Sequence, residues 1–374
     1  MSDALMVSSS FLPGRGGIES YLAELCDLLS PRLAVLAAGS RDGQPLPGDL
    51  SYPTHPFEGR LLWPGRAAVA AIVKASRIED TDRILFGTPW PLALLGPRLA
   101  ARGLRYSVIV HGAEMLVPSA VPGIRGRLAQ ALAGADLLLP VSHYTAEALR
   151  GFLTKHGHPV PPVELLRARV DLARFNPQVD TAEVRARYGI AEHERVVLCF
   201  GRLVERKGVD RAIRALPRIA ERVPGAVLVV AGTGPEMRSL QALAGKTGSR
   251  VVFTGRVPEE DAAAVYAMAD VFTLPVVDRW FGLEIEGLGV VLLEAAACGV
   301  PCVTGRSGGT PEAVLDDQTG FVIDARDEQA LVDRIATLLE DPDLAERMGR
   351  AGRAHVEAEF SERSIPQALL TWLS

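Results

Sequence analysis

The chain has 374 residues, of which 48% are hydrophobic and 23% are charged, and its formal net charge is −5. This composition predicts a folded protein rather than a disordered one, and the length suits two domains better than one. The net negative charge provides no overall basic field, so nucleic acid is not an expected partner.

Short apolar runs alternate with longer helical patterns, which is typical of parallel sheets covered by helices. In the first half, the apolar runs predict strands at 5–7, 33–37, 83–86, 107–110 and 137–140. Helical patterns fill the gaps between them, for example at 18–29 and 124–133. A proline-rich segment at 158–162, followed by 169–177, then indicates a crossing between two domains.

The second half repeats this alternation, with predicted strands at 196–200, 226–231, 251–254, 271–274 and 301–304. Helices are predicted to begin near Val209, Pro235, Pro258 and Gly289, and two more span 327–339 and 343–359. We therefore expect an α/β protein with two doubly wound, Rossmann-like domains facing a central cleft. The expected domains are 1–172 and 173–359, with the tail 360–374 packed back on the first domain. Such sheets bind ligands at the carboxyl ends of their strands.

The cysteines and the terminal sequence bear on location. Cys26, Cys199, Cys298 and Cys302 are scattered, mostly among apolar neighbours, which favours buried thiols in a reducing compartment. They lack the nearby partners of a metal site, so no metal is expected. The sequence shows neither an export signal nor a run of eighteen apolar residues, which predicts a cytoplasmic protein without an ordinary membrane span.

Two acidic residues, Glu286 and Glu294, flank the glycines that open a predicted helix. Glu286 precedes that helix and Glu294 lies about two turns into it. The amides of Gly289, Val290 and Val291 are among those that a helix N-terminus leaves unpaired for an anion. This order suits a molecule with hydroxyls at both ends and phosphates between, such as a sugar nucleotide. The alternative is that Glu286 complements the helix dipole and Glu294 points to solvent.

Two glycine-containing loops, each between a predicted strand and a predicted helix, are candidate phosphate sites. In the first, Gly16 and Gly17 allow close backbone approach beside free helix amides, although a tight turn explains the pattern equally well. In the second, Arg202 presents a planar fork to two phosphate oxygens and Lys207 adds a compact charge. We interpret Arg206, in the same loop, as a solvated charge.

A histidine in the first half is a further candidate. His111 follows an apolar strand, and Gly112 leaves space beside it. The carboxyl end of a strand favours a place in the cleft over an ordinary structural role.

A basic stripe precedes and enters a helix in the first half. At helical spacing Arg66, Ala70, Lys74 and Arg77 share one face, whereas Val69, Ile72 and Val73 are assigned to other faces. This predicts a contact with anionic lipid or with the acceptor, and a core-packed helix with a charged face is the alternative. The residues of this predicted contact are Arg60, Trp63, Arg66, Lys74 and Arg77.

Together these motifs resemble the retaining glycosyltransferases of family 4, which have the GT-B fold, and the resemblance spans 9–360. It rests on Gly16-Gly17-Ile18-Glu19, His111-Gly112, Val141-Ser142-His143-Tyr144-Thr145, 170–177, Gly201-Arg202-Leu203, Lys207-Gly208 and 286–294. Segments 282–295 and 307–312 are similar to PimB-type phosphatidylinositol mannoside mannosyltransferases, which use GDP-mannose and a lipid acceptor. The chain departs from that pattern at Ser10, Arg169, Trp280 and Phe281.

The resemblance implies a role for each matching position. Arg202 and Lys207 hold the donor diphosphate and neutralise its charge as it leaves. Glu286 accepts hydrogen bonds from the donor sugar and Glu294 from the ribose, while His111 lies near the transferred sugar. Further implied donor contacts are Gly16, Gly17, Arg256, Val257, Gly289, Val290 and Val291. No D-x-D pair stands out for a metal-bound diphosphate, so no cofactor is expected besides the donor substrate.

The leading prediction is a retaining α-mannosyltransferase that transfers mannose from GDP-mannose to a phosphatidylinositol mannoside-type lipid. The enzyme is expected in the cytoplasm and peripherally at the inner face of the plasma membrane. One alternative is a family 4 transferase with a UDP-sugar and a soluble acceptor, such as an inositol phosphate, a thiol precursor or a natural product. A non-catalytic nucleotide-sugar-binding protein and a sugar-nucleotide epimerase are the others.

Overall fold

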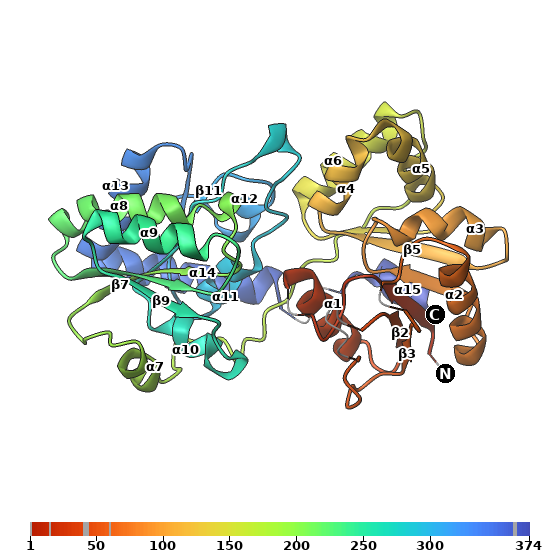
Figure 1. Ribbon diagram of the computed structural model, residues 1–374, viewed down its shortest axis with the longest axis horizontal. Helices are drawn as coiled ribbons and strands as arrows, with labels where there is room; N and C mark the ends of the chain where they lie inside the picture. The colour runs from red at the N-terminus through yellow and green to blue at the C-terminus, as the bar shows by residue number, and fades with distance from the viewer. Residues whose placement is uncertain (1, 15, 40–44, 60, 362–364) are drawn as a thin grey trace. The chain divides into compact units, whose positions relative to one another are not determined.

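The computed structural model describes residues 2–14, 16–39, 45–59, 61–361 and 365–374. The chain forms two compact units. The N-terminal unit comprises 1–168 and 365–374, and the C-terminal unit comprises 169–364. Each unit has its own parallel sheet (Figure 1). Each also has its own hydrophobic core.

The sheet of the N-terminal unit has six parallel strands in the order β3-β2-β1-β4-β5-β6. They are β1 (Ala4–Ser8), β2 (Leu33–Ala37), β3 (Thr54–Pro56), β4 (Arg83–Phe86), β5 (Arg105–Val110) and β6 (Leu138–Pro140). The helices of this part are α1 (Gly17–Leu28), α2 (Arg66–Glu79), η1 (Leu92–Leu95), α3 (Gly96–Ala100), α4 (Ala113–Ser119), α5 (Pro122–Ala133) and α6 (His143–Lys155). The inner strands are almost wholly apolar because helices cover the sheet.

The end of the chain belongs to the N-terminal unit. There, α15 (Gln367–Leu373) is anchored by Trp372, whose Nε1 donates a hydrogen bond to Asp136 Oδ2 at 2.9 Å. Arg32 Nη2 also donates to Ser374 Oγ at 3.1 Å. These contacts tie the last helix to residues just before β6 and β2, which are far away in the sequence.

The sheet of the C-terminal unit has the strand order β12-β11-β10-β7-β8-β9. Its strands are β7 (Arg195–Phe200), β8 (Ala226–Ala231), β9 (Val251–Gly255), β10 (Val271–Leu274), β11 (Cys302–Gly305) and β12 (Gly320–Ile323). Its α-helices are α7 (Ala182–Arg187), α8 (Val209–Arg222), α9 (Met237–Thr247), α10 (Ala262–Ala267), α11 (Val290–Ala297), α12 (Thr310–Ala313), α13 (Glu328–Glu340) and α14 (Pro342–Glu359). Three single-turn helices are η2 (Glu205–Lys207), η3 (Glu259–Asp261) and η4 (Trp280–Gly282).

Both sheets reverse their strand order at one point, between β1 and β4 in the first and between β7 and β10 in the second. Ligands of doubly wound sheets bind outside the carboxyl ends of the strands at this switch point. The Gly16-Gly17 turn follows β1, and the Arg202 loop follows β7. The predicted α/β class and the two doubly wound sheets are confirmed.

The sequence-based prediction omitted β3 and β12, the outermost strands at one edge of each sheet. The three residues of β3 include a proline and form no apolar run, so only pairing with β2 defines them. In β12, Gly320 has φ 151, and a Cβ there would lie 2.0 Å from Cys302 O. With three residues, β3 is too short for a periodic signal.

The cysteines and the long helices add two observations. Cys26, Cys199, Cys298 and Cys302 are buried and free, in agreement with the expected buried thiols. Throughout the described ranges, every helix is too short or too polar to reach across a bilayer.

Candidate active site

The C-terminal unit brings four predicted site residues to the switch point of its sheet. Arg202 and Lys207 lie on the connection from β7 to α8, and both line a small pocket beside Leu274 of β10. Glu286 lies on the connection that follows β10, and Glu294 lies in α11. Strand order thus gathers segments that are far apart in the sequence.

A buried ion pair joins two of these residues. Lys207 Nζ lies 2.7 Å from Glu286 Oε2, and each side chain is only 12% exposed. Burial by itself raises the pKa of Glu286, but the charges of Lys207 and Arg206 outweigh it and lower the pKa overall. Glu286 is therefore a carboxylate that only accepts hydrogen bonds.

Arg206 is not the solvated charge that the sequence predicted. Its Nη1 donates to the same Oε2 atom of Glu286, and its Nε lies 3.6 Å from Glu284 Oε1. The side chain is 24% exposed. The prediction was wrong because the two acids that attract Arg206 lie on a distant connection. The alternation of Glu284 and Glu286 along that connection was the available signal.

The backbone of Glu286 is held by the connection that follows β11. The Glu286 N–H donates to Ser307 Oγ at 3.0 Å, and the Glu286 carbonyl accepts from the Gly309 N–H at 3.0 Å. Ser307 in turn donates to Asp278. Gly308 has φ 52, and a Cβ there would lie 1.9 Å from the Glu286 carbonyl oxygen. Only glycine fits this close approach.

Glu294 lies in a more apolar setting than Glu286. Tyr266 of α10 donates a hydrogen bond to Glu294 Oε2, and its ring stacks on Phe200 with centroids 4.7 Å apart. Burial raises the pKa of Glu294, and Tyr266, Arg174 and Lys207 oppose this only in part. The sequence prediction did not include Tyr266, because no local pattern separates it from other core aromatic residues.

The helix start between the two acids has the predicted form. Gly289 adopts φ 83 and α11 begins at Val290. The amides of Val290 and Val291 therefore have no intrahelical acceptor. They point along the axis of a helix N-terminus, where an anion is stabilised.

Trp280 stands on the same connection as Glu286. It is 57% exposed and has φ 49, a backbone region that is rare for a bulky side chain. The guanidinium of Arg279 lies 5.3 Å from the centre of its ring. An exposed aromatic side chain thus projects where the sequence departs from the PimB-type pattern.

In the N-terminal unit, His111 packs against α1, the helix that begins at the Gly16-Gly17 turn. His111 follows β5, and its Nε2 is 3.0 Å from the Gly87 carbonyl oxygen. Tyr21 of α1 packs edge-on against the His111 ring, with centroids 5.1 Å apart. Since α1 begins at Gly17, this contact links the turn to the histidine.

Some predicted donor contacts are not joined to these clusters. Arg256 and Val257 follow β9, the strand at the edge of the C-terminal sheet, and the Arg256 side chain is exposed. Within the described part of the chain, no hydrogen bond or ion pair links them to Glu286 or Glu294. Arg60, predicted as a membrane contact, lies outside the described residues.

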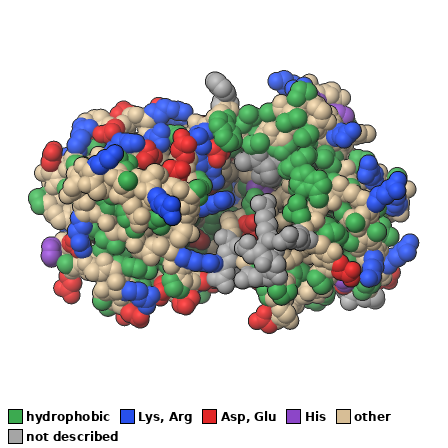
Figure 2. All heavy atoms as spheres, viewed as in Figure 1, with side chains coloured by type: hydrophobic (Ala, Val, Ile, Leu, Met, Phe, Trp, Pro, Cys, Tyr) green, Lys and Arg blue, Asp and Glu red, His purple; other side chains and the backbone are tan. Residues whose placement is uncertain are grey.

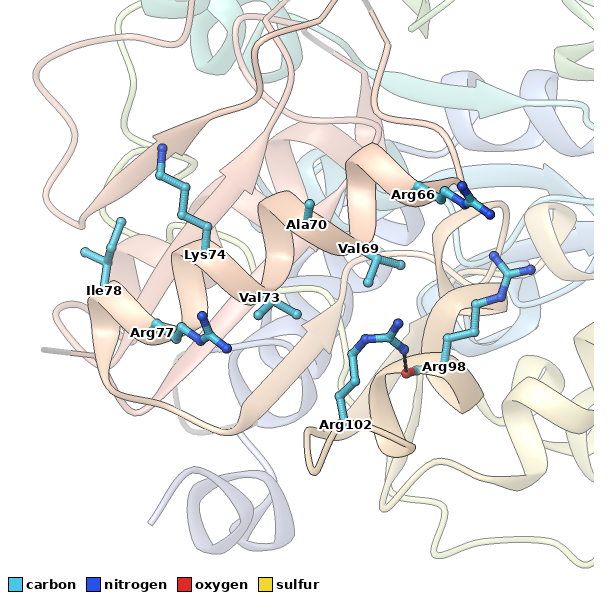
Figure 3. Close-up of a pocket in the computed structure, with 9 residues that line it drawn as sticks. All are labelled: Arg66, Val69, Ala70, Val73, Lys74, Arg77, Ile78, Arg98 and Arg102. Carbon is cyan, nitrogen blue, oxygen red and sulfur yellow. Dashed lines mark hydrogen bonds between the residues drawn. The ribbon is translucent and has the colours of Figure 1, made fainter.

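The basic stripe on α2 lines a surface groove of about 950 Å³, where Figure 3 shows Val69 and Val73 facing Arg98 and Arg102. The sequence placed these two valines apart from the basic stripe, and both nevertheless line the groove, because it lies between α2 and the α3 region. Ile72 is instead fully buried. The lining residues are Arg66, Val69, Ala70, Val73, Lys74, Arg77, Ile78, Arg98 and Arg102.

Basic side chains also gather along the edge of the N-terminal unit where α2 and α3 lie (Figure 2). Trp63, just before α2, is 51% exposed and packs edge-on against Trp90 at 5.7 Å. This surface therefore combines cations with apolar and aromatic groups.

Comparison with known proteins identifies relatives over nearly the whole chain. Residues 180–355 match the family model "Glycosyl transferases group 1". A GDP-mannose-dependent alpha-(1-6)-phosphatidylinositol monomannoside mannosyltransferase of Mycolicibacterium smegmatis is 40% identical, over 93% of this chain and 92% of the relative. The corresponding monoacylated-substrate enzyme of Corynebacterium glutamicum is 35% identical, over 96% of this chain and 94% of the relative.

Solved structures agree on the fold. The sucrose-phosphate synthase of Thermosynechococcus elongatus superposes with a TM-score of 0.81 at 22% identity, covering 98% of this chain and 97% of that one. WaaG, a glycosyltransferase of lipopolysaccharide biosynthesis, has a TM-score of 0.73 at 18% identity and covers 99% of both chains. The chain therefore belongs to the group 1 glycosyltransferases, together with the phosphatidylinositol monomannoside mannosyltransferases of mycobacteria and corynebacteria.

Proposed function

We propose that the chain is a retaining α-mannosyltransferase that transfers mannose from GDP-mannose to a phosphatidylinositol mannoside. One observation supports this most: Arg202, Lys207, Glu286 and Glu294 gather at the switch point of the C-terminal sheet. The names of relatives that are 35–40% identical over nearly their full length support the donor and the acceptor class.

Charge determines how this cluster handles the diphosphate. Arg202 is exposed and offers a planar fork, and Lys207 lies in the pocket beside it. In our proposal both bind the diphosphate, with the amides of Val290 and Val291 at the start of α11. They stabilise the negative charge that develops as GDP leaves, at roughly 3–4 kcal/mol for each fixed donor.

The acids bind the sugars at the two ends of the donor. Glu286, ionised and nearly buried, accepts hydrogen bonds from hexose hydroxyls, and Glu294 accepts them from the ribose. In the N-terminal unit we assign His111 a hydrogen bond to the transferred sugar and Gly16-Gly17 a backbone contact to phosphate. The backbone at Arg256 and Val257 is assigned to the base.

The transfer step balances without an added reagent. The bond between the anomeric carbon and the β-phosphate oxygen breaks, and the acceptor hydroxyl oxygen bonds to the same face of that carbon. The hydroxyl proton passes to the departing phosphate oxygen. GDP and the mannosylated acceptor are the products, and the configuration at the anomeric carbon is retained.

The groove on α2 suits a lipid-bound acceptor. Its lining combines five cations with apolar side chains: Arg66, Lys74, Arg77, Arg98 and Arg102 with Val69, Ala70, Val73 and Ile78. Anionic headgroups are attracted by such cations, and valine and isoleucine side chains favour contact with the acyl region. We therefore propose that the protein works peripherally on the cytoplasmic face of the membrane, with this groove against the lipid.

The proposal is tested by mass spectrometry of the products formed from labelled GDP-mannose and defined phosphatidylinositol mannosides. We expect one added hexose per acceptor and no product from UDP-sugars. Glu286→Gln should abolish turnover but leave GDP affinity nearly unchanged, because that side chain is assigned to the hexose. Product from a UDP-sugar and not from GDP-mannose would overturn the donor assignment.

A further inference from the structure

Six charged side chains of alternating sign form a continuous series of ion pairs at the candidate active site. Glu205 lies 2.7 Å from Arg279, Arg279 lies 3.1 Å from Glu284, and Arg206 continues the series from Glu284 to Glu286. The ion pair between Lys207 and Glu286 ends the series. The series joins η2, which carries Glu205, Arg206 and Lys207, to the connection that carries the other three.

Glu286 differs from the other two acids in this series of ion pairs, because two cations contact one of its oxygen atoms. Arg206 Nη1 and Lys207 Nζ both approach Oε2. Oε1 is the oxygen that their contacts leave for the hydroxyls of a donor sugar. The orientation of the carboxylate therefore depends on where these two cations stand.

The two cations have different tasks once a donor binds. Under the proposed function, Lys207 turns to the diphosphate, which brings negative charge close to Glu286. A buried carboxylate that loses its cation beside new negative charge is harder to ionise, and a protonated one is a weaker acceptor. Some other positive charge must stay with Glu286.

The contacts of Arg206 hold it on Glu286 when Lys207 turns to the diphosphate. Glu284 holds its Nε side while Nη1 remains on Glu286, and the Arg206 carbonyl accepts from the Val277 N–H at 3.1 Å. A guanidinium donates from several nitrogens in a fixed plane, so it can bridge two acids where an ammonium cannot hold the same geometry.

We propose that Arg206 is a positioning residue for the donor sugar, which keeps Glu286 ionised and aimed while Lys207 binds the diphosphate. The inference rests on the proposed function and extends it to a residue outside the motifs that carried the family resemblance. Arg206 acts through Glu286 and makes no contact with the donor in this scheme.

The chain offers a matched control in Arg279. It belongs to the same series of ion pairs and holds Glu205 and Glu284, but its ion pairs do not include Glu286. If the series serves only to fix the two segments, Arg279→Gln and Arg206→Gln should have the same effects. If Arg206 acts on Glu286, only Arg206→Gln should change how activity depends on pH.

The test is the pH dependence of kcat from pH 4 to 8 for wild type, Arg206→Gln, Arg206→Lys and Arg279→Gln, with GDP affinity measured by calorimetry. We expect Arg206→Gln to lower kcat roughly tenfold to a hundredfold. The acid limb of the kcat–pH profile of Arg206→Gln should move to higher pH by about one unit or more, because one neighbouring cation lowers a carboxyl pKa by about that amount. GDP affinity should stay within about threefold, because Arg206 makes no contact with the donor in this scheme. Arg206→Lys should recover part of the shift.

Two outcomes overturn the inference: an acid limb that does not move in Arg206→Gln, or one that moves equally in Arg279→Gln. Failure of the proposed function looks different, because the wild-type protein itself then neither binds GDP nor consumes GDP-mannose. If wild type consumes another nucleotide sugar, the same four proteins are compared with that donor, and the same two outcomes decide.

Discussion

Tyr266 donates its hydroxyl hydrogen to Glu294, and Tyr266 is buried while Glu294 is partly buried. Burial raises the pKa of Glu294, so the folded protein holds that proton more tightly than the unfolded chain. The stabilisation is fully present below the unfolded pKa and is lost as pH rises through the raised folded pKa. Under the proposed function, an ionised acid at this position serves ribose binding rather than stability.

We therefore predict that Glu294→Gln raises the melting temperature at neutral pH, since the amide oxygen still accepts from Tyr266. The advantage over wild type should grow between pH 4 and pH 7 and vanish in acid, as measured by thermal denaturation across pH. GDP affinity should fall roughly tenfold, because a charge-assisted hydrogen bond is lost. A stability difference that is constant with pH would contradict the assigned protonation.

Arg202→Met should reduce kcat about 10²- to 10³-fold with little change in folding stability. Arg202 is exposed, and the proposal gives it the charge on the leaving diphosphate. The control is Arg238→Met, which removes another exposed cation, from α9, and should retain wild-type kcat. Initial rates of GDP release measure both. Equal rates for the two variants would remove Arg202 from the mechanism.

Gly308→Ala should disable the site through the backbone of Glu286. The new Cβ would meet the Glu286 carbonyl oxygen. The left-handed backbone conformation costs alanine a further amount of about 1–2 kcal/mol. Turnover should fall at least about tenfold. Gly245→Ala in α9, where nothing lies within 4 Å of the added carbon, should instead stabilise the helix by about 1 kcal/mol. Wild-type turnover in Gly308→Ala would show that Glu286 needs no such support.

Arg66→Gln combined with Arg77→Gln should weaken binding to anionic vesicles. Each cation near a charged surface contributes about 1 kcal/mol, so the pair predicts roughly a thirtyfold loss. Vesicle co-sedimentation at two salt concentrations measures it, and activity on a detergent-dispersed acceptor should persist. Arg347→Gln with Arg350→Gln, on exposed positions of α14, is the control. Similar losses in both double variants would argue against a specific surface.

Arg353→Met should destabilise the C-terminal unit. The Arg353 guanidinium donates to the carbonyl oxygens of Phe175, Ala297 and Leu172, and removing it leaves those acceptors unpaired. We expect a loss of about 2–3 kcal/mol in the free energy of unfolding, measured with urea. Arg350→Met, three residues earlier on α14, removes only an exposed pair with Glu346 and should cost less than about 0.5 kcal/mol.

The sequence predicts the strands and loops of this protein better than the contacts between distant residues. The strands at 33–37, 83–86, 226–231 and 271–274 coincide with β2, β4, β8 and β10. Each is an apolar run between polar segments, so its signal lies within a few consecutive residues. The switch-point loops were also predictable, because they follow directly from the alternation of strands and helices.

The sequence by itself determined the α/β class, the two sheets and the loops that carry Arg202, Lys207 and Glu286. Only the tertiary structure decided that Arg206 turns onto Glu286, that Gly308 must be glycine, and that Arg98 and Arg102 complete a groove with α2. The reason is range: periodicity and capping act between near neighbours in the chain. An ion pair or a close backbone approach depends on where a distant segment comes to rest.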